Sequence, residues 1–457
     1  MSGYSPHTAR DIAAMLEAIG VGSIDDLFAD VPARLRARAA IALPEGMTEP
    51  ELRRHLGALA ARNADAAGAA VFLGAGAYPH WVPAVVDQIL LRSEFATAYT
   101  PYQPEVSQGA LQATFEFQTF SALLLGLEVA SASLYDGASA TAEAVLMARR
   151  LRPGRRVVWL ARALHPHYRA TVATYLRGLG GVEVREVPFG ADGRTDLGAL
   201  RAGLGGDTLC LVLGYPNVFG VVEHVALFAD AVRAVGALTI TATPEALALA
   251  LVRSPGASGV DIAVAEGQSF GLPLSYGGPG VGLFATRERF VRSMPGRLVG
   301  ETVDARGRRG YVLTLATREQ HIRRERATSN ICTNQGLCAL AVTVYLSLLG
   351  RHGLASLARA NYRAAHAVAA RLEAAGVPAR FAGPFFNEFV VRAPAAARAW
   401  EAAAQAGVVA GFPLGRWYPE LEGSLVLCVT ETHTPEQVDR LIGVLAAPAP
   451  AARAAGG

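Results

Sequence analysis

A four-residue turn, Asp-Gly-Ala-Ser at 136–139, stands directly before a strong helical pattern in the segment SLYDGASATAEAVLMARR (133–150). Small residues at a helix start leave backbone N–H groups and the positive end of the helix dipole open to an anion such as phosphate. A plain helix cap by Ser139 or Thr141 is the commoner use of such a motif. The turn therefore predicts either a phosphate site or an ordinary helix start.

A second candidate is His165, which follows the apolar run RRVVWLAR (155–162) and precedes Pro166. Ligands of α/β proteins bind at the carboxyl ends of the sheet strands, which is where His165 is expected to lie. The His165 side chain could stack on an aromatic ring, or it could simply hydrogen-bond a loop. We expect His167, two residues further on, to face solvent.

Two polar stretches have the composition of an interface or a ligand rim. The first, TAYTPYQPEVSQG (97–109), places Tyr99, Tyr102 and Gln103 in a segment that is too polar for a core and is typical of a turn-rich loop. An ordinary surface loop fits this pattern equally well. The second, TREQHIRRERATSNICTNQ (317–335), fits a salt-bridged helix followed by a polar loop. Its hydroxyl and amide groups also suit a polar cavity; they are Ser329, Asn330, Thr333 and Asn334.

The chain contains no lysine, because all 42 of its Lys-plus-Arg residues are Arg. Chemistry that needs a Schiff base on a Lys amine is therefore excluded within this chain. The segment EGQSFGLPLSYGGPGVGLFAT (266–286) is rich in glycine, but these glycines lead into a strand and not into a helix. That context excludes a dinucleotide-binding fingerprint, and tight turns explain the glycines.

The composition narrows the class of protein further. The formal net charge of +3 gives no electrostatic footprint for nucleic-acid binding. The four cysteines follow no CxxC pattern and lie in apolar sequence, which predicts buried free thiols in a reducing cytoplasm and no metal site; they are Cys210, Cys332, Cys338 and Cys428. The N-terminus lacks the pattern of a signal peptide, and no run of roughly 18 apolar residues predicts a membrane span.

The order of patterns along the chain predicts an α/β protein with four parts. Residues 1–65 read as helices, with Thr8 and Thr48 as caps. Within 66–335, short apolar strands alternate with amphipathic helices, which favours a mostly parallel sheet covered on both faces. A long helix, apolar nearly all round and therefore buried, is expected from about 336 to 349, and it opens a small C-terminal α+β domain (336–445). The tail, 446–457, has the composition of a disordered segment.

Taken in order, the motifs resemble one family over residues 1–445. The segments that carry the resemblance are YSPHT, TAYTPYQPEVSQGALQATFEFQT, ASLYDGASATAEA, DIAVAEGQSFGLPLSYGGPGVGLFAT, MPGRLVGETVDARGRRGYVLTLATREQHIRRERATSNICTNQ and PFFNEF. They are similar to the α subunit, the amino-terminal half, of the decarboxylating glycine dehydrogenase, which is the P-protein of the glycine cleavage system. The resemblance implies the aspartate-aminotransferase-like fold of the fold-type I enzymes that use pyridoxal phosphate (PLP). That fold has a large seven-stranded, mostly parallel sheet domain and a smaller C-terminal domain.

The resemblance also implies that two different subunits share the function and that only one of them binds the cofactor. In the family's split form, a homologous β subunit carries a His-Lys pair whose Lys binds PLP, and two copies of each subunit form an α2β2 assembly. Here the Schiff-base position is Gln268 and the position of the carboxylate that pairs with the pyridine nitrogen is Thr243. Ser139 and His165 would be relics of a cofactor pocket. The resemblance thus implies that this chain binds no cofactor and that PLP lies in the partner.

The implied reaction belongs to the complex. Glycine is decarboxylated on the partner's PLP, and the aminomethyl group passes to the lipoyl arm of the H-protein. This chain would complete the partner's active site with residues from the two polar stretches, namely Tyr99, Tyr102, Gln103, Ser329 and Asn330. Two alternatives remain at this point: a purely structural scaffold subunit, and an independent enzyme that holds PLP noncovalently beside residues 136–139.

Overall fold

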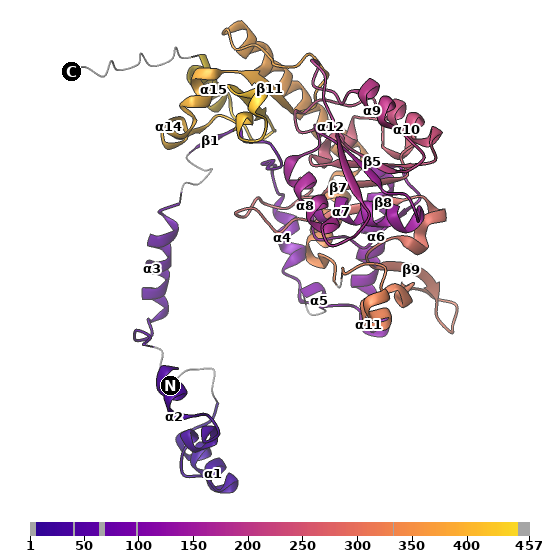
Figure 1. Cartoon of the computed structure of the whole chain (residues 1–457). Helices are drawn as coiled ribbons and strands as arrows, with labels where there is room; N and C mark the ends of the chain where they lie inside the picture. The colour runs from indigo at the N-terminus through magenta and orange to yellow at the C-terminus, as the bar shows by residue number, and fades with distance from the viewer. Residues whose placement is uncertain (1–5, 40–41, 64–68, 97–98, 332, 447–457) are drawn as a thin grey trace, which may run out of the picture. The chain divides into compact units, whose positions relative to one another are not determined.

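The computed structural model (Figure 1) describes residues 6–39, 42–63, 69–96, 99–331 and 333–446. The expected disordered tail and Cys332 lie outside the described residues, apart from Ala446 at the end of the last helix. The chain forms two compact units, Met1–Ala64 and Asp65–Gly457, which we describe separately.

The first unit is helical, as its sequence predicts. It contains α1 (Ala9–Ile19), α2 (Ala33–Arg38) and α3 (Glu49–Ala60). The Thr8 side chain accepts the N–H of Asp11 and the Asp11 carboxylate accepts the N–H of Thr8, so a capping box starts α1. Thr48 and Glu51 form the same box at α3. No residue of these three helices is buried, so their apolar side chains are left uncovered within the unit.

The second unit is built around a seven-stranded sheet, which confirms the predicted architecture. Its strand order is β2-β8-β7-β6-β5-β3-β4, and only the pairs that involve β8 are antiparallel. The strands are β2 (Val129–Ala130), β3 (Val157–Ala161), β4 (Glu183–Val187), β5 (Thr208–Gly214), β6 (Leu238–Thr243), β7 (Ile262–Glu266) and β8 (Gly282–Thr286). Helical crossovers put the carboxyl ends of β3, β5, β6 and β7 at one edge of the sheet.

Both faces of the sheet are covered, because side chains alternate along each strand. Val264 on β7 packs into one apolar core, whereas its neighbours Ala263 and Ala265 pack into another. The first core takes residues of α7 (Gly137–Leu151), α8 (Pro166–Leu176) and α10 (Val225–Ala234); the second takes residues of α6 (Gln108–Leu125) and α12 (Gly336–Ala374). The remaining helices of the large domain are α4 (Ala84–Leu90), α5 (Ser93–Ala96), α9 (Leu197–Gly203) and α11 (Gln320–Arg323).

Helix α12 begins where the sequence predicts, but it is not buried all round. Its buried residues include Cys338 and Tyr345, whereas Leu337 and Leu348 are about half exposed. At Gly350, φ is 56°, and this break divides α12 into two helical halves. Among the described residues, α12 is the one helix long and apolar enough to cross a membrane by length and composition, and 44% of its apolar window is buried in the protein.

The C-terminal part of the second unit, which we call the C-terminal domain, contains both strands and helices. Strands β11 (Glu388–Arg392), β14 (Ser424–Cys428) and β13 (Phe412–Pro413) form an antiparallel sheet, and α15 (Pro435–Ala446) packs in its core. Helices α13 (Pro394–Arg398) and α14 (Trp400–Gln405) lie between β11 and β13 in the chain. The early strand β1 (Ala70–Val71) pairs with β12 (Val408–Val409), so residues near position 70 lie among the yellow C-terminal elements (Figure 1).

The described cysteines agree with the sequence prediction of free thiols. Cys210, Cys338 and Cys428 are buried and unbridged, and burial raises the pKa of each thiol. The thiol groups therefore stay protonated and act as small apolar side chains.

Candidate functional site

The Asp-Gly-Ala-Ser turn forms the cap of α7. The Asp136 carboxylate accepts the N–H of Ser139 at 2.7 Å, and the Ser139 hydroxyl oxygen accepts the N–H of Asp136 at 3.2 Å. Each side chain thereby satisfies a backbone donor of the other, which is a complete capping box. The hydroxyl of Ser139 is thus used within the helix start.

The first turn of α7 already has an anion beside it. The carboxylate of Glu266, at the end of β7, accepts the N–H of Gly137 at 2.9 Å. It also accepts the N–H of Val281 at 2.9 Å and that of Gln268 at 3.1 Å. Burial raises the pKa of Glu266 to about 7, although the three N–H donors favour its charged form. A residue that the sequence patterns did not single out therefore faces the predicted phosphate position.

Gln268 and Thr243 stand at the two positions where the sequence predicts that cofactor-binding groups are missing. Both side chains form hydrogen bonds within the protein. The Gln268 amide donates to the carbonyl of Leu272 at 2.7 Å. The Thr243 hydroxyl, at the end of β6, donates to the carbonyl of Tyr215 at 2.7 Å and is fully buried. A carboxamide cannot form a Schiff base, and a hydroxyl cannot hold a pyridinium in its charged form.

His165 hydrogen-bonds a loop, which is the second of its two predicted roles. One ring nitrogen lies 2.9 Å from the Ala75 carbonyl, and the other accepts the N–H of His167 at 3.2 Å to cap α8. Its ring also packs edge-on against Trp417, with 5.0 Å between the ring centroids. Burial lowers the pKa of His165 to about 4, so the ring is neutral. His167 is exposed, as predicted.

These residues do not fit PLP. The whole sequence lacks a lysine, the end of β6 carries Thr243 where a carboxylate is needed, and the Glu266 carboxylate takes the N–H groups that would hold a phosphate. A phosphate dianion placed beside this carboxylate would meet like charge at short range, which opposes binding. We therefore derive no chemistry through PLP in this chain.

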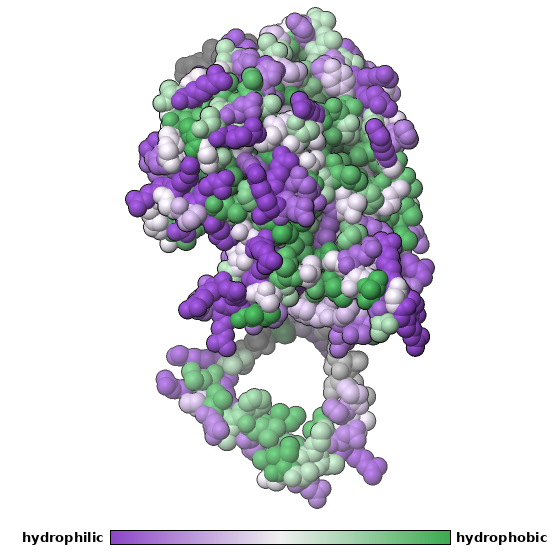
Figure 2. Space-filling model, turned by 90° about the vertical axis from the view of Figure 1, so that its right-hand side faces the viewer, coloured by the Kyte–Doolittle hydropathy of each residue, from purple (hydrophilic) through white to green (hydrophobic). Residues whose placement is uncertain are grey.

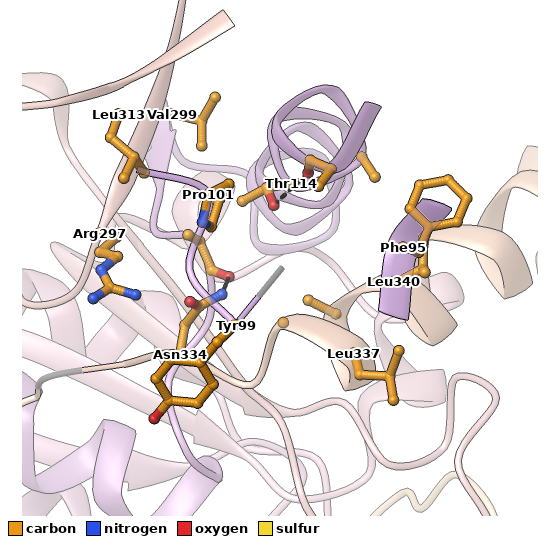
Figure 3. Close-up of a pocket in the computed structure, with 15 residues that line it drawn as sticks. Phe95, Tyr99, Pro101, Thr114, Arg297, Val299, Leu313, Asn334, Leu337 and Leu340 are labelled. Atoms are coloured by element: carbon orange, nitrogen blue, oxygen red, sulfur yellow. Dashed lines mark hydrogen bonds between the residues drawn. The ribbon is translucent and has the colours of Figure 1, made fainter. Parts of the chain in front are cut away.

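A second place brings together part of the predicted polar stretches. A cavity of about 460 Å³ lies beside the loop 99–107. Figure 3 shows Tyr99, Arg297 and Asn334 toward one end of this cavity, while Phe95 and Leu340 lie toward the other. The cavity thus has a polar end and an apolar end, as ligand and partner sites commonly do.

Arg297 fastens the loop to the body of the protein. The Arg297 side chain is 5% exposed and donates to the Tyr102 hydroxyl at 2.9 Å and to the Thr100 hydroxyl at 3.2 Å. Its guanidinium also lies over the Tyr102 ring, 5.2 Å from the centroid, and 3.5 Å from the Glu319 carboxylate. Tyr99 stays 89% exposed, so the anchored loop presents an aromatic side chain outward.

The remaining predicted contact residues are not among those that Arg297 binds or that line the cavity. Gln103 is exposed, and its side chain makes no hydrogen bond with the described residues. The Ser329 hydroxyl accepts the N–H of Ile331 at 3.0 Å, and Asn330 is exposed. From the same stretch it is Asn334 that lines the cavity, where its amide donates to the Ala132 carbonyl at 2.9 Å.

A buried polar cluster, which no sequence pattern predicted, joins the end of β6 to the C-terminal domain. His80 is 2% exposed and lies between Glu245, at 3.0 Å, and Glu431, at 2.9 Å. The two carboxylates raise the pKa of His80 to about 10 against the cost of burial, so it is a cation. Nearby, Glu388 accepts the N–H of Ala75 and the hydroxyl of Tyr78, and burial raises its pKa to about 8.

The pKa of Glu388 leads to a prediction about pH. A carboxyl group with a raised pKa in the folded state stabilises that state when protonated, and this contribution is lost as pH rises from about 4.5 to about 8. The free energy of unfolding of Glu388→Gln should therefore fall less between pH 5 and 8 than that of the wild-type chain, by roughly a few kcal/mol. The measurement is the free energy of unfolding in urea at several pH values. The exposed Glu401→Gln is the matched control, and equal pH profiles in the two variants would refute the assignment.

Comparison with known proteins places the sequence of this chain in a family. The family model described as "Glycine cleavage system P-protein" matches residues 2–445. The chain belongs to the P-protein family. A curated relative from Anaeromyxobacter dehalogenans (strain 2CP-C), "Probable glycine dehydrogenase (decarboxylating) subunit 1", is 55% identical over 445 residues, which is 97% of this chain and 99% of the relative. The resemblance read from the sequence motifs is thus confirmed.

Solved structures agree with the P-protein assignment and with the fold. The crystal structure of a glycine decarboxylase (P-protein) of the glycine cleavage system, in inhibitor-bound form, has a TM-score of 0.87 and 43% identity, and the match covers 97% of this chain and 99% of that one. A sphingosine-1-phosphate lyase from Burkholderia pseudomallei K96243 has a TM-score of 0.62 at 17% identity, covering 89% of this chain and 92% of the lyase. The second likeness concerns the fold alone, and it supports the fold-type I architecture.

Proposed function

We propose that the chain is the cofactor-free subunit of a two-subunit glycine dehydrogenase and that it completes the active site of a homologous partner that holds PLP. The observation that carries this proposal is the lack of any lysine in a P-protein whose own pocket is filled by Glu266. The relatives named as subunit 1 support a division between two chains.

In this proposal the partner's PLP supplies the decarboxylation of glycine, and the aminomethyl group passes to the lipoyl arm of the H-protein. This chain supplies surface and positioning. We propose that the exposed part of loop 99–107 reaches the partner's active site with Tyr99, Tyr102 and Gln103. We propose the same role for Ser329 and Asn330. Arg297 would hold the loop in the orientation that the partner needs.

Uncovered apolar side chains support a partner surface. In the view of Figure 2, apolar residues form patches between charged ones. Exposed large apolar side chains occur on or beside α4, α6 and α12 in the second unit; they are Leu91, Leu123, Leu337 and Leu348. Permanent subunit interfaces bury about 2,000 Å² or more and are rich in such residues. We propose an α2β2 assembly located in the cytoplasm.

Co-expression with the homologous lysine-bearing subunit tests the assembly. We expect the two chains to elute together on size-exclusion chromatography at micromolar concentration, because an interface of this size binds tightly. We expect the separated chain to be poorly soluble, because it would expose this apolar surface. Separate elution of both chains at that concentration would contradict the proposal.

Replacing the missing groups should not create an enzyme. A double variant, Gln268→Lys with Thr243→Asp, would supply a Schiff-base amine and a carboxylate at the end of β6. Turnover should nevertheless stay at background, because Glu266 still occupies the helix start and active sites need their groups placed to within about 0.5 Å. Glycine–bicarbonate exchange measured on the variant alone checks this. Activity above that of the wild-type chain would show that the pocket is intact.

A further inference from the structure

Backbone donors from three places in the chain meet at one carboxylate. The Glu266 oxygens accept N–H groups from Gly137 at the start of α7, from Gln268 just after β7 and from Val281 just before β8. A carboxylate held by three backbone donors at a helix start has the contacts that a bound anion makes.

The surrounding backbone closes tightly around this carboxylate. A Cβ atom on Gly280 would lie 3.0 Å and 3.2 Å from the two Glu266 carboxylate oxygens, and one on Gly137 would lie 2.3 Å from the Tyr168 hydroxyl. A Cβ on Gly282 would come within 2.6 Å of the Asp136 carbonyl. A side chain at any of these three positions would require its neighbours to shift, because the backbone approaches them closely here.

Two buried polar atoms on the residues that follow β7 have no hydrogen-bond partner among the described residues. The Gln268 carbonyl oxygen and the Ser269 hydroxyl are buried, and neither makes a hydrogen bond among the described residues. Buried polar atoms of this kind cost free energy unless something satisfies them. The chain segment that follows Glu266 thus holds two polar atoms that the described residues leave unpaired.

From these contacts we infer that Glu266 is a built-in anion: its carboxylate occupies, at the start of α7, the place of a phosphate, and removing it opens a latent site for a phosphate monoester. This inference concerns the chain's own pocket and does not rest on the proposed function. Glu266 is part of β7, so its carboxylate is held permanently beside the N–H donors. It therefore competes with free phosphate for these donors at a high effective concentration. The wild-type chain should therefore take up no phosphate there.

The test compares the full-length chain with Glu266→Ala, using inorganic phosphate, PLP and pyridoxal as probes at pH 7.5. The matched control is Glu143→Ala, which removes another buried carboxylate from α7 that lies outside the cluster around Glu266. We expect Glu266→Ala to lower the unfolding midpoint by about 5 °C or more, and millimolar phosphate to restore part of that loss. PLP should act as phosphate does, whereas pyridoxal, which lacks the phosphate, should have no effect.

Titration calorimetry gives the deciding comparison. We expect phosphate or PLP to bind Glu266→Ala at least about 10-fold more tightly than the wild-type chain or Glu143→Ala, a difference of about 1.4 kcal/mol. Equal affinity in all three proteins would overturn the inference, as would a folded Glu266→Ala that binds no phosphate at 10 mM, roughly ten times a millimolar dissociation constant.

A second variant keeps the test decisive if Glu266→Ala fails to fold. Glu266→Gln preserves the volume of the side chain but places an amide group among backbone donors. We expect the N–H groups of Gly137, Gln268 and Val281 to exchange with deuterium about 10-fold faster in Glu266→Gln than in the wild-type chain, because their acceptor is weakened. Glu143→Gln should leave these three exchange rates unchanged. Unaltered exchange in Glu266→Gln would refute the role given to the carboxylate.

Discussion

The purified chain alone should not decarboxylate glycine above background, and addition of the homologous lysine-bearing subunit should raise the rate by about 10³-fold or more. The reason is chemical, since the chain has no amine at the Schiff-base position and its Glu266 carboxylate fills the start of α7. Glycine–bicarbonate exchange, measured for each chain alone and for the mixture, gives the result. Full activity from this chain alone would refute the assignment of its role.

The second large effect is expected at Arg297. In the assembled enzyme, Arg297→Gln should lower kcat/KM by about 10- to 100-fold, because it releases Thr100 and Tyr102 and the loop loses its fixed orientation. Tyr102→Phe removes only one of the two hydrogen-bond acceptors and should have a smaller effect.

The control for Arg297→Gln is Arg308→Gln, which breaks an exposed ion pair with Asp304 on the hairpin formed by β9 (Leu298–Val303) and β10 (Arg309–Thr314). All variants should form the complex with the partner, as judged by size-exclusion chromatography. If Arg297→Gln is as active as Arg308→Gln, the chain acts as a scaffold and its loop takes no part in the partner's site.

Much of the fold follows from local patterns. The runs that become β3, β5, β6 and β7 are short and mostly apolar, and helical patterns separate several of them, so a mostly parallel sheet could be predicted. The pairing of β1 with β12 could not, because two-residue strands have no periodicity and their contact spans more than three hundred residues. The end of the first half of α12 could be predicted as well, because the long apolar stretch stops at about residue 349, next to the break at Gly350.

The candidate site, too, could be predicted from the sequence only in part. Gln268 and Thr243 could be located because family motifs fix their place in the sequence, and the lack of lysine is a property of composition. The role of Glu266 depends on N–H groups from Gly137 and Val281, which only the folded sheet brings together. Arg297 lies in the motif MPGRLVG, where a charged residue between apolar neighbours was the available signal of a buried contact.

The cluster around His80 carried no signal in the sequence. Its members, Glu245, Glu388 and Glu431, are spread over three distant segments, and single His and Glu residues are ordinary surface residues in most sequences. Their burial follows from the docking of the C-terminal domain at the carboxyl end of β6.

The position of PLP in the assembled enzyme tests the central claim most directly. Reduction with sodium borohydride converts a Schiff base into a stable amine, so the cofactor stays attached to the chain that held it. Mass spectrometry of the two separated chains should then find the phosphopyridoxyl group on the partner alone, and this chain at its unmodified mass. A complex that decarboxylates glycine while its partner chain carries no phosphopyridoxyl group after reduction would contradict the account.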